Sequence, residues 1–143
     1  MAYRVRKVNY CKTTVPSRVG QAAAVLGAVK DAGINMHAFS GFPSRAGKSQ
    51  IDFISDDSAA IRRLAKKSGW RLSKIKKAFL VQGNDEVGAI HKIFKKLADE
   101  KINVTAADAV AAGVGRYGMI LWVKPKVYNR AARVLKAREV LEA

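Results

Sequence analysis

The residues best suited to bind a small charged ligand stand at the beginnings of two expected helices. Gly20 follows the turn Val15–Arg18, and Gly88 follows the turn Gly83–Glu86. The first turn of a helix has backbone N–H groups without partners inside the helix, and the helix dipole favours negative charge there. A glycine at that place lets a ligand or a neighbouring backbone approach closely. The two loops therefore predict binding of an anion such as an amino-acid carboxylate.

Polar side chains around the same loops could hold the rest of such a ligand. Asp85 could accept a hydrogen bond from an ammonium group, or it could simply cap the helix that follows. Asn35 and Asn103 stand where strands are expected to begin, and their amides could bind a zwitterion or bridge the loop backbone. The candidate ligand-binding residues are Ser17, Arg18, Val19, Gly20 and Asn35 in the first set, and Asp85, Glu86, Val87, Gly88 and Asn103 in the second.

No group of residues suited to catalysis or metal binding stands out. His37 and His91 are the only histidines, and neither has partners at metal-ligand spacing. Carboxylates are scarce, so no pair suggests general acid–base chemistry. The run Gly113–Gly118 begins like a dinucleotide-binding fingerprint but precedes a strand instead of a helix. We therefore expect neither an enzyme nor a cofactor, and we expect the single cysteine, Cys11, to be buried and inert.

The two glycine loops belong to an internal repeat with an offset of 68 residues. Val19–Gly20 recurs as Val87–Gly88, and the match continues to Ile54 without a gap. Apolar character is kept along this stretch where identity is lost. A period of this kind predicts a duplicated structural unit. We place repeat 1 at residues 1–74 and repeat 2 at residues 75–143.

Apolar residues three and four positions apart predict an amphipathic helix after each glycine loop. The inward stripe is expected to contain Val19, Ala22, Ala23, Leu26 and Val29 in repeat 1, and Val87, Ile90, Phe94, Leu97 and Ala98 in repeat 2. Gly33 and Lys101 are expected to end these helices. A second helix is expected at about residues 57–68 in repeat 1 and at about residues 126–138 in repeat 2.

Strands are expected before and between these helices. They are placed at Arg4–Lys12 and Ile75–Gln82, from Ile34 and Ile102 onward, on both sides of glycine-bearing hairpins at Gly41–Gly47 and Ala112–Arg116, and at Trp70–Lys74. Each repeat thus has the order βαββαβ. This order is typical of the split βαβ, or ferredoxin-like, arrangement, in which helices cover one face of an antiparallel sheet. The predicted fold class is α+β, with two such repeats.

The composition suits a folded, strongly basic protein. Hydrophobic residues make up 49% of the 143 residues, and the formal net charge is +16. A field of this size attracts polyanions, although most of the cations fall on helix positions that are expected to face solvent. The sequence shows no signal peptide and no membrane-spanning stretch. We therefore expect a cytoplasmic protein without membrane contact.

Several of these features together resemble the ACT domain. The resemblance rests on an acidic residue three positions before a glycine, an amphipathic helix, and an Ile-Asn strand start. In repeat 2 these are Asp85–Gly88, the helix with Phe94 and Leu97, and Ile102–Val104; in repeat 1 they are Ser17–Gly20 and Ile34–Met36. The resemblance implies a non-catalytic regulatory protein that binds an amino acid or another small ligand, either as a stand-alone sensor or as a subunit that acts on a protein partner.

Two departures from the family pattern concern the ligand. The family's usual acidic residue is Ser17 in repeat 1, and the proline often found just before the glycine is Val19 or Val87. These departures indicate that repeat 1 binds a different ligand or none.

RNA-recognition modules share the same order of elements and offer an alternative function. The run Arg116–Trp122 faintly resembles their third-strand motif. Strand alternation, however, places Tyr117 on the helix side and leaves only Trp122 for the open face, where such modules stack bases on aromatic rings. An apolar open face without stacked aromatics favours protein contact instead, and we expect a homodimer. Binding of RNA, DNA or another polyanion stays the alternative.

Overall fold

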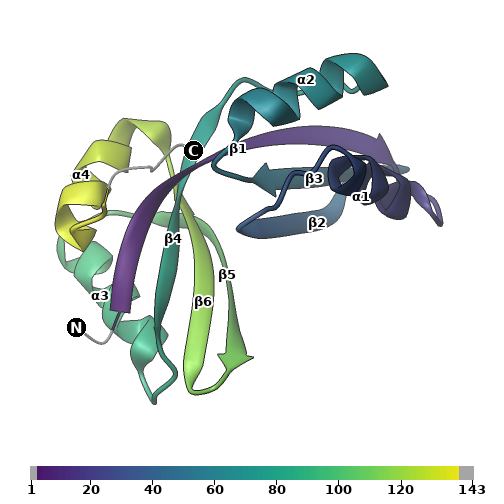
Figure 1. The fold of residues 1–143 in the computed structure, drawn as a ribbon. Coiled ribbons are helices and arrows are strands. Elements are labelled where there is room, and N and C mark those ends of the chain that lie inside the picture. Colours follow the sequence, from purple (N-terminus) through teal and green to yellow (C-terminus); the bar gives the residue numbers. More distant parts are fainter. Residues whose placement is uncertain (1–2, 139–143) are drawn as a thin grey trace. The chain divides into compact units, whose positions relative to one another are not determined.

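The structure, a computed structural model, describes residues 3–138 as an α+β fold (Figure 1). Its elements in chain order are β1 (Tyr3–Pro16), α1 (Gln21–Asp31), β2 (Ala38–Arg45), β3 (Lys48–Ile54), α2 (Ser58–Ser68), β4 (Lys76–Asn84), α3 (Ala89–Asp99), β5 (Val104–Gly113), β6 (Arg116–Val123) and α4 (Pro125–Leu135). The chain forms two compact units. We call residues 3–8 together with residues 77–138 the Gly88 unit, and residues 9–76 the Gly20 unit. None of the described helices is long and apolar enough to span a bilayer.

The Gly88 unit has the strand order β1, β4, β6, β5, with the first part of β1 at one edge. β4 and β6 are antiparallel, with Phe79 opposite Leu121. Helices α3 and α4 lie side by side against one face of these strands (Figure 1). The core between them includes fully buried Ile93 and Leu97, and the ring of Tyr128 stacks on Phe79 at 4.4 Å.

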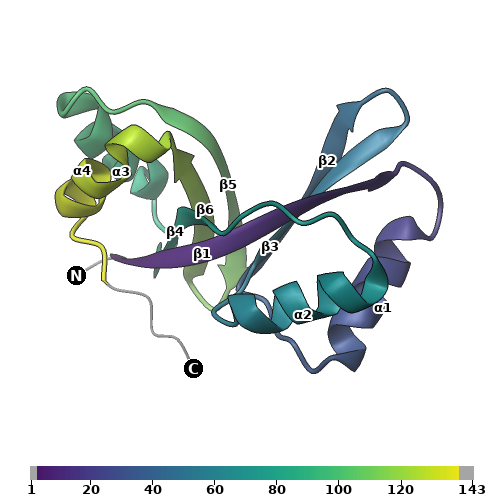
Figure 2. The same ribbon diagram turned by 90° about the horizontal axis from the view of Figure 1, so that it is seen from above.

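The Gly20 unit has the strand order β2, β3, β1, with antiparallel pairing on both sides of β3. Cys11 of β1 lies opposite Phe53 of β3. This pair matches Phe79 and Leu121 of the Gly88 unit at the repeat offset, so the two sheets have the same register. Helices α1 and α2 lie on the same side of the strands (Figure 2).

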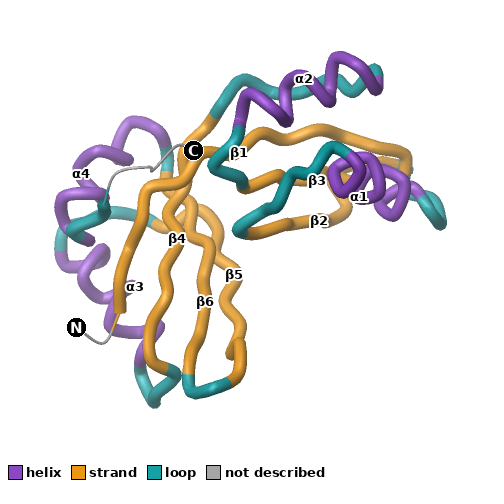
Figure 3. The backbone as a smooth tube through the Cα atoms, in the orientation of Figure 1, coloured by secondary structure: helices purple, strands orange, loops and turns teal. Residues whose placement is uncertain are grey.

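The α+β, ferredoxin-like fold class is confirmed. The predicted order of elements is found except for the fourth strand of each repeat, and the predicted strand Trp70–Lys74 is wrong. The segment 70–75 is drawn as loop in Figure 3, yet it runs beside β1, because Ser73 N–H donates to the carbonyl of Lys12 at 2.8 Å. In the Gly88 unit, the chain after α4 joins β1 through paired bonds between Arg138 and the backbone of Val5 and Lys7.

The predicted inward faces of the first helices were wrong at their beginnings. The helices begin two residues after the valines, so Val19 and Val87 lie in the turn and are fully exposed. The buried positions are Val25 and Val29 in α1. In α3 they are Ile93 and Leu97, whereas the predicted Ile90 and Ala98 are exposed and Phe94 is half-buried. Ala22 and Ala23 of α1 are exposed as well.

The strand boundaries also differ from the predicted ones. β2 begins at Ala38, four residues after Ile34, and it continues through the expected hairpin segment Gly41–Ser44 to a turn at Ala46–Gly47. The two compact units also divide the chain differently from the repeat, because residues 3–8 lie with residues 77–138. The boundary between the two sequence repeats, placed after residue 74, therefore stays a prediction.

Candidate functional site

The two glycine loops have the same backbone conformation. Gly20 and Gly88 are the N-caps of α1 and α3 and have φ of 88° and 82°, in the left-handed region that favours glycine. Before each glycine, an equivalent hydrogen bond holds the loop: Ser17 N–H donates to Gly47 O, and Asp85 N–H donates to Gly115 O, both at 2.9 Å. The duplicated sequence thus builds the same helix entrance twice.

Both helices begin without a side-chain cap. In α3, Ala89 N–H donates to Glu86 O at 3.1 Å and Lys92 N–H donates to Gly88 O at 3.0 Å. The amides between them, on Ile90 and His91, have no hydrogen-bond partner within residues 3–138. Asp85 therefore does not cap α3, which was one of its two predicted roles. Two N–H groups remain available at the positive end of the helix dipole.

A hollow of about 360 Å³ lies beside the beginning of α3. Asp85, Glu86 and Gly88 line it from the loop, Ile90 from the helix and Val110 from β5. Tyr117 of β6 completes the lining. The volume falls in the range of small-molecule sites, and the lining combines apolar surface with a few polar groups, as such sites do.

Tyr117 is the most informative residue of this hollow. Its side chain is only 5% exposed, and its buried hydroxyl has no hydrogen-bond partner among the described residues. Burial raises the pKa of the hydroxyl, and nearby Tyr3 and Glu86 raise the pKa further. A buried polar group without a partner destabilises a fold by about 1–3 kcal/mol, so such a group calls for an explanation. The hydroxyl is closed to solvent in this structure, so a ligand in the hollow could supply the missing partner only after the residues that cover the hydroxyl move apart.

The acidic residues of the loop differ in their interactions. Asp85 is exposed, and its carboxylate has no ion pair or side-chain hydrogen bond within the described range. The carboxylate of Glu86 lies 3.8 Å from the ammonium of Lys92. Asp85 is thus the acid in the lining that could pair with a ligand's ammonium group.

The equivalent hollow of the Gly20 unit has another character. It measures about 310 Å³ and includes Ser17, Arg18, Ala22, Phe42 and Ser49, which occupy the repeat positions of the lining just described. Arg18 replaces an acid here, and no acidic residue lines this hollow. Ser49 takes the place of Tyr117. The prediction that repeat 1 differs in its ligand is consistent with these side chains.

The structure does not bring all the predicted site residues together. Ser17 and Arg18 line one hollow, whereas Gly20 does not contribute to its lining. Asp85, Glu86 and Gly88 line the other hollow. The side chains of Val19 and Val87 extend into solvent. The asparagines lie past the far ends of the helices: Asn35 lines a separate hollow with Gly33, and Asn103 is exposed beyond α3. An eleven-residue helix spans about 16 Å, which separates them from the glycines.

Sequence reasoning missed Tyr117 as a site residue. It placed Tyr117 correctly on the helix side, since the residue belongs to the core that contains Ile93 and Leu97. One feature of the sequence could have indicated that Tyr117 lies near the site. Tyr117 follows directly after the β5–β6 turn, and Gly115 of this turn accepts the hydrogen bond from Asp85 N–H. That this core residue keeps an unpartnered hydroxyl depends on side-chain packing, which the sequence pattern does not contain.

The chain contains two copies of a ferredoxin-like unit, each with a glycine-started helix and an adjoining hollow. Solved structures share this fold. A protein of Bacteroides thetaiotaomicron matches with a TM-score of 0.77 and 15% identity, over 95% of this chain and 90% of that one. The ligand-free regulatory subunit of aspartate kinase from Thermus thermophilus matches with a TM-score of 0.66 and 15% identity, over 95% of both chains.

A structure of aspartokinase α and β subunits matches with a TM-score of 0.63 and 21% identity, over 94% of this chain and 95% of that one. A scan against models of protein families finds no match, and a search of curated proteins finds none either. The chain therefore shares its fold with the regulatory subunit of aspartate kinase, in agreement with the ferredoxin-like fold that the sequence predicted.

Proposed function

We propose that the chain is a non-catalytic regulatory protein that binds an amino acid in the hollow beside Gly88 and acts on a partner protein. The observation that carries this proposal is the buried, unpartnered hydroxyl of Tyr117 next to a helix entrance with two available amides. The fold shared with regulatory subunits of aspartate kinase supports the regulatory part of the proposal.

The lining suggests how the ligand is held. The carboxylate accepts hydrogen bonds from the amides of Ile90 and His91, and the helix dipole stabilises its charge. The carboxylate of Asp85 accepts a hydrogen bond from the ammonium group, and the hydroxyl of Tyr117 bonds a polar ligand atom. Exposed Ile90 and Val110 leave apolar surface at the rim of the hollow. We therefore propose an amino acid with an apolar side chain as the ligand.

The partner, the compartment and the oligomeric state are part of the same proposal. The regulatory subunits that share the fold belong to a multi-subunit enzyme by name, which supports action on a catalytic partner. The single buried cysteine is consistent with a reducing compartment, and we propose the cytoplasm. A homodimer is proposed from the apolar character of the edge strand β5, whose Val110 is exposed.

A thermal-shift screen against the common amino acids, followed by calorimetric titration, tests the proposal. A ligand at one hundred times its dissociation constant raises the stability of the native state by about 2.7 kcal/mol. Tyr117→Phe and Asp85→Asn should each remove most of the shift. The matched substitutions Ser49→Ala and Ser17→Ala, at the equivalent positions of the Gly20 unit, should leave it unchanged. The proposal is overturned if no amino acid raises the melting temperature, or if the variants of the two units lose the thermal shift equally.

A further inference from the structure

A further hollow, lined by none of the residues of the glycine loops, lies along α2 in the Gly20 unit. The chain turns back after α2 at Gly69, which has φ of 76°, and the following segment returns beside the helix (Figure 2). Between the two lies a groove of about 380 Å³. Arg62, Arg63, Ala65 and Lys66 line it from the helix, and Trp70 and Leu72 line it from the returning segment. We call it the α2 groove.

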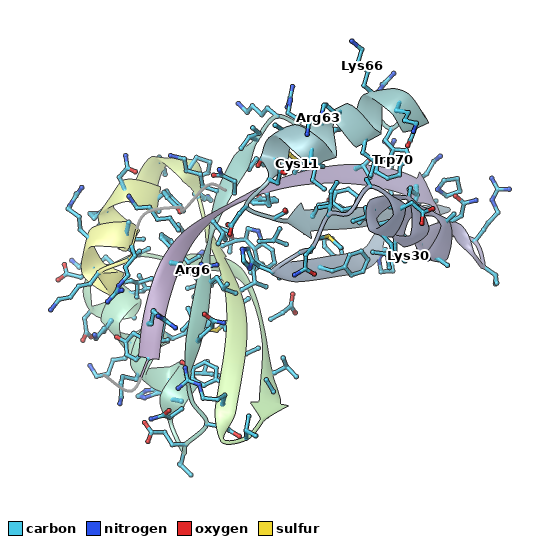
Figure 4. The ribbon with its side chains drawn as sticks, in the orientation of Figure 1. Arg6, Cys11, Lys30, Arg63, Lys66 and Trp70 are labelled. Atoms are coloured by element: carbon cyan, nitrogen blue, oxygen red, sulfur yellow. The ribbon has the colours of Figure 1, made fainter. Side chains whose placement is uncertain are left out.

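The rim of the α2 groove is purely cationic. Arg62, Arg63 and Lys66 are exposed, and none of them has an ion pair or a hydrogen bond within residues 3–138. Figure 4 shows the side chains of Arg63 and Lys66 extending from α2 away from the fold. No aspartate or glutamate occurs between Asp57 and Asp85. The positive charge of the rim is therefore not neutralised locally, in contrast to the helix α3, where Lys92 and Lys95 pair with acids.

The floor of the groove is aromatic and apolar. Trp70 is half-buried, and its ring stacks on Phe53 at 5.9 Å with an angle of 7° between the planes. This stacking fixes the orientation of the indole while leaving part of it in the groove. Leu72 and Ala65 extend the apolar surface. A ligand that is complementary to both the cationic rim and the aromatic floor therefore carries negative charge next to a flat, apolar ring.

We propose that the α2 groove binds single-stranded nucleic acid, with a base against Trp70 and phosphates at Arg62, Arg63 and Lys66. Sites of this kind combine a basic groove with an aromatic platform. The cations continue beyond the groove along the returning segment at Arg71 and Lys74, which suits several successive phosphates. An anionic membrane fits less well, because the apolar residues Ile61 and Ala65 of α2 are buried in the unit and cannot insert between lipids.

Fluorescence anisotropy with labelled oligouridylate and oligothymidylate of about fifteen nucleotides tests the proposal. The variant Arg63→Ala/Lys66→Ala removes two rim cations. The control Lys126→Ala/Arg133→Ala removes two exposed cations from α4, the counterpart helix of the Gly88 unit. The groove variant should lower affinity about tenfold or more, and it should reduce the slope of log K against log salt by about 1.4, since each phosphate contact contributes about 0.7. The control should change both quantities little.

A second readout reports on the base. The chain has two tryptophans, so in a Trp122→Phe background Trp70 is the only one. Oligonucleotide binding should quench its fluorescence, whereas inorganic polyphosphate, which lacks bases, should not. The proposal is overturned if the two charge variants lose affinity equally, or if polyphosphate quenches as oligonucleotides do. It is likewise overturned if vesicles of equimolar phosphatidylcholine and phosphatidylglycerol bind through the groove while neither oligonucleotide does.

Discussion

The hollows beside Gly20 and Gly88 share a backbone and differ in their chemistry. Each begins with a left-handed glycine and an equivalent loop hydrogen bond. Beside Gly88 the side chains include Asp85, Glu86 and the buried hydroxyl of Tyr117. Beside Gly20 the same positions hold Ser17, Arg18 and Ser49, and an exposed Phe42 takes the place of Val110 in the lining.

This comparison separates what the fold supplies from what the side chains add. The helix amides and the glycine come with the duplicated backbone, so both units offer a place for an anionic group. A counter-charge for an ammonium group is present only beside Gly88. Under the proposed function, we therefore expect a zwitterion to bind beside Gly88 and any ligand beside Gly20 to lack a positive charge.

The largest expected effect concerns the cores of the two units. Leu97 and Val29 occupy equivalent buried positions of α3 and α1. Leu97→Ala removes more buried carbon and should destabilise the protein by about 3–4 kcal/mol, whereas Val29→Ala should destabilise it by about 2 kcal/mol. Urea denaturation followed by fluorescence measures both, with Trp122 reporting from the Gly88 unit and Trp70 from the Gly20 unit. Equal losses in the free energy of unfolding would contradict the expectation that Leu97 contributes more buried apolar surface than Val29.

The next effect tests whether both glycine loops require a residue that tolerates the left-handed conformation. Gly20→Ala and Gly88→Ala place a side chain at positive φ, where an added Cβ meets no atom but the backbone is strained. Each should lower the free energy of unfolding by about 1–2 kcal/mol. Gly27→Ala, inside α1 and also unobstructed, is the control and should raise it by up to about 1 kcal/mol. A loss at Gly27, or no loss at either loop, would show that left-handed strain does not govern these entrances.

A third change sharpens the difference between the hollows. Tyr117→Phe removes the unpartnered hydroxyl and keeps the ring, so the ligand-free protein should become more stable by about 1 kcal/mol. The same change should weaken amino-acid binding. Chemical denaturation with and without the ligand found in the screen measures both effects. A destabilised ligand-free variant would mean that the hydroxyl already has a partner, such as an ordered water.

The sequence was sufficient for the parts of the fold that depend on local pattern. The helix α2 lies where it was expected, with Asp57 accepting a hydrogen bond from Ala60 N–H at its beginning. The glycine helix entrances and the repeat register were also predictable, because turn chemistry and periodicity encode them. The buried faces of α1 and α3 were predicted wrongly at their beginnings. Val19 and Val87 continue the apolar spacing, but each helix begins only after the glycine.

The candidate site was less accessible to sequence reasoning. Asn35 and Asn103 were predicted as ligand-binding residues because their amides stand at expected strand starts and suit a zwitterion, yet the length of the helix separates them from the glycine loops. Tyr117 and Val110 reach the hollow from strands far along the chain. The α2 groove forms because the chain turns back at Gly69, which places Trp70 beside Lys66. Such juxtapositions are properties of tertiary packing.

The smallest expected effect concerns a position at which the two sheets differ. Cys11 in the Gly20 unit corresponds in register to Phe79 in the Gly88 unit, and both are buried. Burial raises the pKa of the Cys11 thiol, and the charge of Arg62 only partly offsets this. The native state therefore holds this proton more tightly than the unfolded chain does. The resulting contribution to stability is complete below the ordinary thiol pKa of about 8.5 and is lost as pH rises through the higher native value.

Replacing Cys11 by valine isolates this contribution from those of the other groups whose pKa values shift. Burial also raises the pKa of Tyr10, and it lowers that of Lys76, but these residues are present in both proteins and their contributions cancel in the difference. Urea denaturation should show that the wild-type chain loses stability relative to Cys11→Val as the pH rises above about 8.5. Native Cys11 should also react slowly with iodoacetamide and rapidly in urea. Parallel pH profiles would show that the thiol is not held neutral by its surroundings, and would remove this difference between the two sheets.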